Sequence, residues 1–148
     1  MSRKTCFVVS PIGDDKSGAR RNADYVLKNL IRPALTKLGY SVPARIDQLE
    51  PVGSITDAII SQLERADLVV ADLAGLNPNV MFEMGIREAW AKPLIPIAPN
   101  DLKLPFDVAG VSTVFYPSLE GRTKLNARQK KKVVEGIQLQ AKQFQSGE

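Results

Sequence analysis

Short apolar runs alternate with amphipathic patterns along the whole chain, and this alternation restricts the fold more than any other sequence feature. Five runs have the length of strands: residues 5–10, 40–46, 67–73, 93–98 and 112–116. Four segments carry apolar residues at helical spacing: residues 20–38, 54–65, 77–91 and 123–144. Such an alternation is typical of a parallel β-sheet whose strands are joined by right-handed helical crossovers.

The number of elements predicts one α/β domain over residues 1–148. We expect a flavodoxin-like three-layer sandwich with a five-stranded parallel sheet in the order 2-1-3-4-5. Pro33 predicts a kink or local break in the first helix, and Pro43 predicts an edge position for the second strand. In this strand order a ligand crevice lies at the carboxyl ends of the first and third strands, so the loops after residues 10 and 72 are candidate site loops.

The composition excludes several kinds of catalytic site. The chain has no histidine and one cysteine. A Ser-His-Asp or Cys-His set cannot be built from these residues, and neither can a zinc site with imidazole ligands or a cysteine cluster. We therefore expect no metal and no cofactor, and we expect carboxylates to carry any acid–base or nucleophilic chemistry.

The apolar runs are too short for a signal-peptide core or a membrane span. The run behind the basic N-terminus is only Cys6-Phe7-Val8-Val9, and no stretch approaches the roughly 18 residues of a spanning helix. We therefore expect a cytoplasmic protein that does not contact membranes.

Positive charge is concentrated at the C-terminal end of the chain. Residues 122–148 hold 7 basic and 2 acidic groups, whereas residues 1–121 hold 13 basic and 14 acidic groups. The basic helix at about 123–144 could contact nucleic acid, or it could present a solvated face. No aromatic side chain interleaves its charges as a stacking surface requires, so the solvated face is favoured over a nucleic-acid partner.

The loop after the first strand contains Ser10, Pro11, Ile12 and Gly13. A hydroxyl, a rigid proline and a flexible glycine at a strand end can present backbone N–H groups to a ligand, although a simple turn also explains this pattern. The loop has neither the Gly-Lys-Ser/Thr of a Walker loop nor the spacing G-x-G-x-x-G, so an ordinary nucleotide-fold fingerprint is missing.

Glu83 is the unusual residue of the helix expected over 77–91. It is a single carboxylate within a run that is otherwise apolar or glycine, residues 80–86. The helix N-terminus favours its ionised form, whereas apolar neighbours raise its pKa, and the sequence leaves the net direction open. A surface pair between Glu83 and Arg87 is the alternative interpretation.

Several further polar residues flank the same predicted crevice. Asp72 ends the third strand, where it can accept a ligand hydroxyl or cap the next turn. Arg20 and Arg21 open the first helix and could contact phosphate or carboxylate, although solvated arginines are also common there. Asp47, after the second strand, is a further candidate at the rim.

Three segments together resemble a known family. CFVVSPIG, RRNADYVLKNLIRPAL and ADLVVADLAGLNPNVMFEMGIREA resemble the nucleoside 2-deoxyribosyltransferase-like superfamily. More remotely, they are similar to TIR-like NAD-cleaving domains of bacterial defence systems. The resemblance covers roughly residues 5–116, and both groups have flavodoxin-like sheets.

The resemblance implies an N-glycosidic cleavage in which Glu83 is the nucleophile or stabilises a cationic sugar. It also implies that the loop from Ser10 to Gly13 contacts the substrate, with Asp72, Asn77 and Asn79 among the sugar or substrate contacts. The transferases commonly have aspartate at the position of Asn77, and this departure favours NAD cleavage over base exchange.

Two classes of function follow. The first is an N-glycosyl hydrolase or transferase that acts on a nucleoside, a nucleotide or NAD, where NAD is a substrate rather than a cofactor. The second is a non-catalytic nucleotide-binding or self-associating TIR-like signalling module. For both classes, the resemblance implies a role in antiphage defence or nucleotide signalling. It is also compatible with a homo-oligomer.

Overall fold

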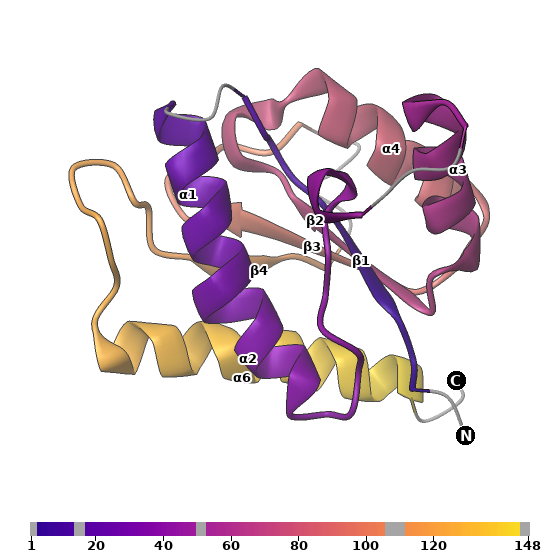
Figure 1. The fold of residues 1–148 in the computed structure, drawn as a ribbon. Coiled ribbons are helices and arrows are strands. Elements are labelled where there is room, and N and C mark those ends of the chain that lie inside the picture. The colour runs from indigo at the N-terminus through magenta and orange to yellow at the C-terminus, as the bar shows by residue number, and fades with distance from the viewer. Residues whose placement is uncertain (1–2, 14–16, 50–52, 106–111, 146–148) are drawn as a thin grey trace.

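The computed structural model describes residues 3–13, 17–49, 53–105 and 112–145. In this part of the chain, four parallel strands form one sheet in the order β1-β2-β3-β4 (Figure 1). The strands are β1 (Cys6–Val9), β2 (Leu68–Asp72), β3 (Leu94–Pro99) and β4 (Val114–Tyr116). The α/β class and the parallel sheet predicted from the sequence are therefore confirmed.

The second of the five predicted strands, residues 40–46, is wrong among the described residues, because this segment makes only an isolated parallel bridge between Ala44 and Phe7. The Val8 N–H donates to the Ala44 carbonyl at 3.0 Å, and the Ser41 N–H donates to the Lys4 carbonyl at 2.9 Å. Pro43 has no N–H to donate, so a regular ladder cannot continue through it. The segment still lies along the free side of β1, as the expected strand order requires.

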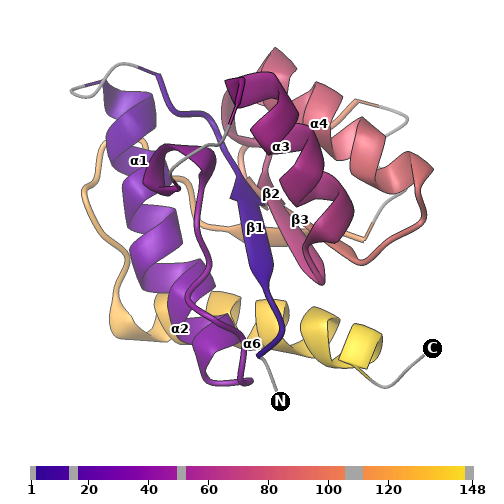
Figure 2. The same ribbon diagram turned by 45° about the vertical axis from the view of Figure 1, so that its right-hand side comes forward.

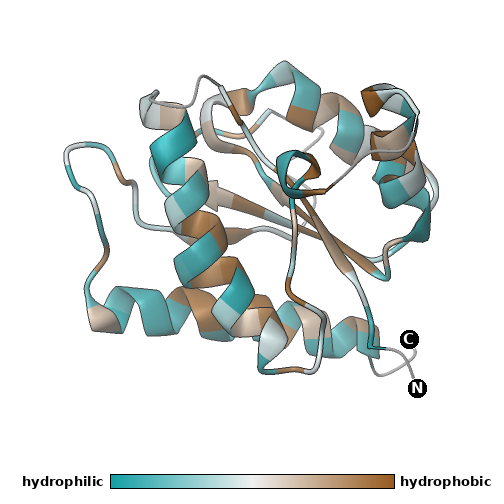
Figure 3. Ribbon diagram, viewed as in Figure 1, coloured by the Kyte–Doolittle hydropathy of each residue, from teal (hydrophilic) through white to brown (hydrophobic). Residues whose placement is uncertain are grey.

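Helices cover both faces of the sheet, which makes the predicted three layers (Figures 1 and 2). One layer contains α1 (Gly18–Val26), α2 (Arg32–Thr36) and α6 (Ala127–Gln145), and the other contains α3 (Ile55–Arg65) and α4 (Pro78–Ala89). Alternate strand residues enter the two cores: Cys6 and Val8 pack in the α1–α6 core, whereas Phe7 and Val9 pack in the α3–α4 core. Figure 3 shows the corresponding hydrophobic strands between helices with hydrophilic outer faces.

The local break predicted at Pro33 takes the form of a wider helical turn. Residues Leu27–Ile31 form the π-helical segment η1 between α1 and α2, and the Arg32 N–H donates to the Leu27 carbonyl. Proline lacks the N–H of a regular turn, and its ring collides with the carbonyl four residues earlier. A π-helical turn absorbs this irregularity without ending the helix.

The C-terminal helix α6 packs its apolar side on the sheet and on α2. Val133, Ile137 and Ala141 are buried at spacings of four, whereas the basic run at 130–132 is partly or fully exposed. None of the helices in the described ranges is long and apolar enough to cross a bilayer.

Candidate active site

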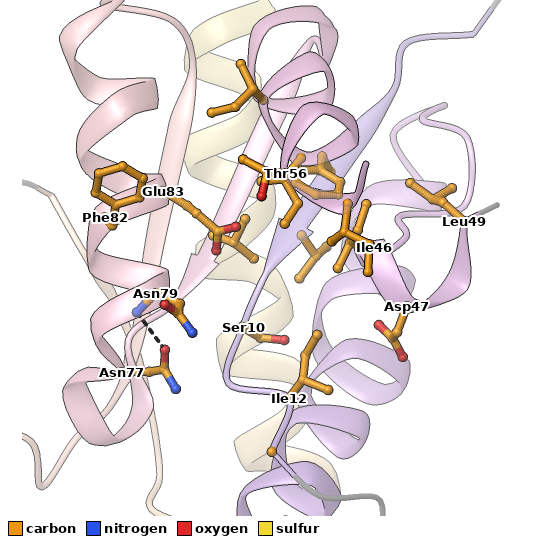
Figure 4. Close-up of a pocket in the computed structure, with 17 residues that line it drawn as sticks. Ser10, Ile12, Ile46, Asp47, Leu49, Thr56, Asn77, Asn79, Phe82 and Glu83 are labelled. Carbon is orange, nitrogen blue, oxygen red and sulfur yellow. Dashed lines mark hydrogen bonds between the residues drawn. The ribbon is translucent and has the colours of Figure 1, made fainter. Parts of the chain in front are cut away.

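A cavity of about 780 Å³ opens beside the carboxyl end of β1, on the α3–α4 side of the sheet. Its volume lies in the range of small-molecule sites. Among the described residues, four segments line it: β1 with its following loop, the short helix η2 (Ile46–Gln48) with the next residue, the first half of α3 and the first half of α4. The lining residues are Phe7, Val8, Val9, Ser10, Ile12, Gly13, Ile46, Asp47, Leu49, Ile55, Thr56, Ile59, Ile60, Asn77, Asn79, Phe82 and Glu83 (Figure 4).

The fold brings together most of the candidate site residues named from the sequence. Those that line the cavity are Ser10, Ile12, Gly13, Asp47, Asn77, Asn79 and Glu83. Those that do not line it are Pro11, Arg20, Arg21 and Asp72. The predicted loop after β1 therefore lines the cavity. Of the second predicted loop, after β2, only the part at the start of α4 does so.

Asn77 fixes where α4 begins and hence where Glu83 lies. Its Oδ1 accepts hydrogen bonds from the Asn79 N–H at 2.9 Å and the Val80 N–H at 3.3 Å, and Pro78 occupies the first helical turn. Asparagine followed by proline is a strong helix start, because the cap satisfies free N–H groups and proline has none to satisfy. Val80 and Met84 then face the core, which leaves Glu83 on the cavity side.

The Glu83 carboxyl group points into the cavity in Figure 4. Burial raises its pKa above the ordinary value, because a less polar environment disfavours the charged form. The direction of the pKa shift that the sequence left open is therefore upward, and its cause is desolvation. A carboxylate removed from water in this way is a stronger base and nucleophile than a surface carboxylate.

Arg87 does not serve as a surface partner of Glu83. Its guanidinium is buried and donates to the Leu63 carbonyl at 2.7 Å and to the Pro93 carbonyl at 3.0 and 3.1 Å. These bonds tie the C-terminal half of α4 to the end of α3 and the start of β3. The carboxylate of Glu83 faces the cavity instead.

Ser10 presents a hydroxyl group to the cavity. Its Oγ is buried and has no hydrogen-bond partner among the described residues. Buried hydroxyl groups are nearly always paired in folded proteins, so this atom is available to a ligand or a water molecule. Figure 4 shows Ser10 in the lower part of the site, between Asn79 and Ile12.

Gly13 allows the loop after β1 to pass close to the start of α1. Its φ angle is +59°, and a Cβ placed there would lie 2.9 Å from Oγ of Ser17. That Oγ is the cap of α1 and accepts the Arg20 N–H at 3.0 Å. Both the backbone conformation and the space therefore require glycine at this position.

Asp47 lies at the rim and is held by two arginines. Nε of Arg45 donates to its Oδ1 at 3.0 Å, and NH2 of Arg20 lies 2.9 Å from its Oδ2. Arg45 also reaches Asp24 at 2.6 Å and is only 2% exposed. Burial opposes ionisation of Asp24, but the two guanidinium groups prevail and lower the pKa of that carboxyl.

Asp72 is buried beneath the neighbouring loop. Its Oδ1 accepts the Ala74 N–H at 3.1 Å and the Tyr116 hydroxyl at 2.8 Å. It thereby caps the turn η3 (Ala74–Leu76), which is one of the two roles that the sequence allows. Burial raises its pKa to about 6, although both hydrogen bonds act in the opposite direction.

Sequence reasoning missed the apolar wall of the cavity and the arginine behind it. The wall comes from η2, the residue that follows it, and α3: Ile46, Leu49, Ile55, Ile59 and Ile60, with Thr56 among them. The sequence feature that could have indicated this wall is the apolar face of α3, because packing against the sheet does not cover all of it. Nothing in the sequence distinguished Arg45 from a surface residue.

The sequence matches no protein-family model, and it matches no curated protein. The fold, by contrast, is similar to solved structures of nucleoside-processing enzymes. The CMP N-glycosidase of Clostridium botulinum is 16% identical with a TM-score of 0.57, over 92% of this chain and 99% of that chain. The 2-deoxyribosyltransferase of Bacillus psychrosaccharolyticus is 12% identical with a TM-score of 0.55, over 84% and 93%. The chain has the fold of these enzymes.

A 2-deoxyribosyltransferase from Leishmania mexicana matches over a shorter region. It is 19% identical with a TM-score of 0.49, over 66% of this chain and 65% of that chain. The resemblance in fold predicted for the deoxyribosyltransferase-like group is confirmed, and the remote likeness to TIR-like domains stays a prediction. At these identities the likeness establishes the fold alone.

The site can bind and polarise a small organic substrate. It offers a desolvated carboxylate, a buried hydroxyl group, two amide side chains and an apolar wall. In the described ranges, no three His, Cys, Asp or Glu side chains lie close enough together to hold a metal ion.

Proposed function

We propose that this protein cleaves the N-glycosidic bond of a nucleoside or nucleotide, with Glu83 as the catalytic carboxylate. The observation that carries the proposal is the position of Glu83, a partly desolvated carboxylate that faces a cavity of about 780 Å³. The fold supports it, because two structural neighbours with TM-scores above 0.5 are a 2-deoxyribosyltransferase and a CMP N-glycosidase.

The chemistry needs one carboxylate beside the anomeric carbon. As the bond between that carbon and the base nitrogen breaks, the base leaves with the electron pair and the sugar becomes cationic. A Glu83 oxygen then forms a bond to the anomeric carbon or stabilises its charge. Water or a second base resolves the intermediate and releases Glu83, and the proton lost by that nucleophile balances the departed base.

The other polar lining residues suit the sugar. The Asn77 Oδ1 is occupied by backbone N–H groups, so its amide NH₂ is the part left for a substrate. Asn79 and Ser10 line the same cavity. We assign these three side chains to sugar hydroxyl groups, and the Ile12–Gly13 loop segment to close contact with the substrate.

The remaining predicted contacts receive indirect roles in this proposal. Arg20 holds Asp47 at the rim, and Asp72 fixes the loop that leads to Asn77. Pro11 is buried and shapes the loop between Ser10 and Ile12. Arg21 is exposed on α1 and receives no role in substrate contact.

The test is base release from a panel of ribonucleosides, deoxynucleosides, CMP and NAD, followed by chromatography. Glu83→Gln keeps the size of the side chain and removes its charge. We expect it to lower release by at least about 1,000-fold, since the reaction has lost its nucleophile. Glu88→Gln is the matched control, because Glu88 is exposed on the same helix outside the cavity.

Equal release by the parent and Glu83→Gln would reject the proposal. Release of nicotinamide from NAD would identify the activity as NAD cleavage, which the TIR-like resemblance implies. Saturable nucleotide binding without any released base would instead favour the non-catalytic signalling module. A role in antiphage defence and self-association both rest on the resemblance, and sedimentation with and without nucleotide tests the latter.

A further inference from the structure

The polar side chains at the start of α4 and the apolar side chains of α3 line different parts of the cavity, with Ile12 beside Ser10 and Asp47 beside Ile46 in Figure 4. In Figure 4, Ser10, Asn77 and Asn79 lie on one side of the Glu83 carboxylate, and Thr56 lies on the other. The lining on the Thr56 side includes the isoleucines of α3. A ligand with one polar half and one apolar half could therefore place each half against side chains of matching polarity.

A nucleoside has the same division. Its sugar carries several hydroxyl groups, its base is a flat heteroaromatic ring, and the scissile bond joins the two. A carboxylate that reaches the anomeric carbon must lie at this junction. If the sugar hydroxyls meet the asparagines and Ser10, the base must extend toward α3, where apolar side chains favour a flat ring.

Thr56 is the polar side chain on that α3 wall among the lining residues that the structure describes. It stands in the first turn of α3, next to the Ser54 cap, whose Oγ accepts the Asp57 N–H at 3.1 Å. In Figure 4 its hydroxyl oxygen is directed toward the cavity. A hydroxyl group can both donate and accept, so it can pair with a ring nitrogen or an exocyclic group.

We propose that the α3 wall is the base subsite and that Thr56 determines selectivity for a leaving base with a hydrogen-bonding edge. The inference rests on the proposed function, because it takes Glu83 as the point where the bond breaks. The ligand class is a purine or pyrimidine base carrying a ring nitrogen or amino group toward α3. The isoleucine side chains contact the face of the base, and the Thr56 hydroxyl group forms a hydrogen bond with its edge.

The test measures binding of adenosine, cytidine and benzimidazole riboside by calorimetry. Benzimidazole has no hydrogen-bonding groups on its six-membered ring, so it reports binding without a hydrogen bond from that edge of the base. Glu83→Gln is the common background, which prevents turnover during the titration. Into it are placed Thr56→Val, which has nearly the same shape, and Ser61→Ala, which removes a hydroxyl of α3 outside the cavity lining.

We expect adenosine, cytidine or both to bind more tightly than benzimidazole riboside, and Thr56→Val to weaken that binding by about fivefold. Benzimidazole riboside should bind equally with and without the change, and Ser61→Ala should alter neither. An equal effect on all three ligands, no effect, or no binding of any of them overturns the inference. The release assay decides the proposed function separately: base release that depends on Glu83 but not on Thr56 leaves that function standing.

Discussion

The Tyr116 hydroxyl donates a 2.8 Å hydrogen bond to Oδ1 of Asp72, although 44 residues separate them in the chain. Both side chains are almost fully buried, with exposed fractions of 2% and 1%. The bond joins the ends of β2 and β4 beneath the loop that leads to Asn77. Burial also raises the pKa of Tyr116, so this residue remains the donor and Asp72 the acceptor.

Asp72 should make the stability of the protein depend on pH. Its pKa is raised by burial from an ordinary value of 3.8 to about 6, so the folded state binds a proton more tightly than the unfolded chain. Its contribution is then complete below about pH 4 and is lost as the pH rises through 6, by about 2–3 kcal/mol. Urea unfolding of the parent and Asp72→Asn from pH 4 to pH 7 measures this change.

The asparagine variant can still accept both hydrogen bonds, but it does not titrate. The stability of the parent relative to Asp72→Asn should therefore fall with increasing pH, because all other carboxylates are common to both proteins. A constant difference across this range would show that Asp72 keeps the same protonation in both states.

Glu83 should set the acid side of the rate profile. A nucleophile or cation stabiliser must be ionised, and burial raises the pKa of Glu83 above its ordinary 4.5. We expect kcat/KM for base release to fall as the pH decreases, with a midpoint above 4.5. A midpoint at or below that value, in a protein still folded by circular dichroism, would contradict a desolvated carboxylate.

Gly13→Ala should disturb both the fold and the site. A residue with φ of +59° is strained in any L-amino acid, and the new Cβ would lie 2.9 Å from Oγ of Ser17. We expect unfolding free energy to fall by about 1–3 kcal/mol and base release to decrease, since the loop lines the cavity. Thermal or urea unfolding with the release assay measures both.

Gly121→Ala is the matched control for this experiment. Gly121 has a φ angle of +75°, and no atom of the described residues lies within 4 Å of the position of a new Cβ, so it reports backbone strain without a steric conflict. Gly13→Ala should be the more damaging change. An equal decrease in unfolding free energy for the two variants would mean that the contact with Ser17 does not contribute to the destabilisation.

Arg45→Met should destabilise the rim of the cavity. The change removes the buried cation that holds Asp24 and Asp47, while both carboxylates remain partly open to water. We therefore expect a loss of about 1–3 kcal/mol, less than for a fully buried ion pair. Urea unfolding measures it, and Arg128→Met, at an exposed position on α6, should stay within about 0.5 kcal/mol of the parent.

The sequence predicted the class of fold because its signals are local. Buried parallel strands require continuous apolar runs such as residues 68–71 of β2, and Asn77 followed by Pro78 is a helix start that depends on neighbouring residues alone. Glu83 was identified in the same way, as a single charge in an apolar helical segment. The prediction of a second strand at residues 40–46 was wrong for a local reason too, because Pro43 has no N–H group for a regular ladder.

The arrangement of the site depended on contacts between distant segments. The sequence by itself determined that a carboxylate, a hydroxyl group and two asparagines stand near strand ends. Tertiary structure decided that Asp72 is buried against Tyr116, that Arg45 holds Asp47, and that α3 supplies an apolar wall. The physical reason is that burial and pairing of charged groups depend on which segments the fold packs together, and sequence spacing does not record those neighbours.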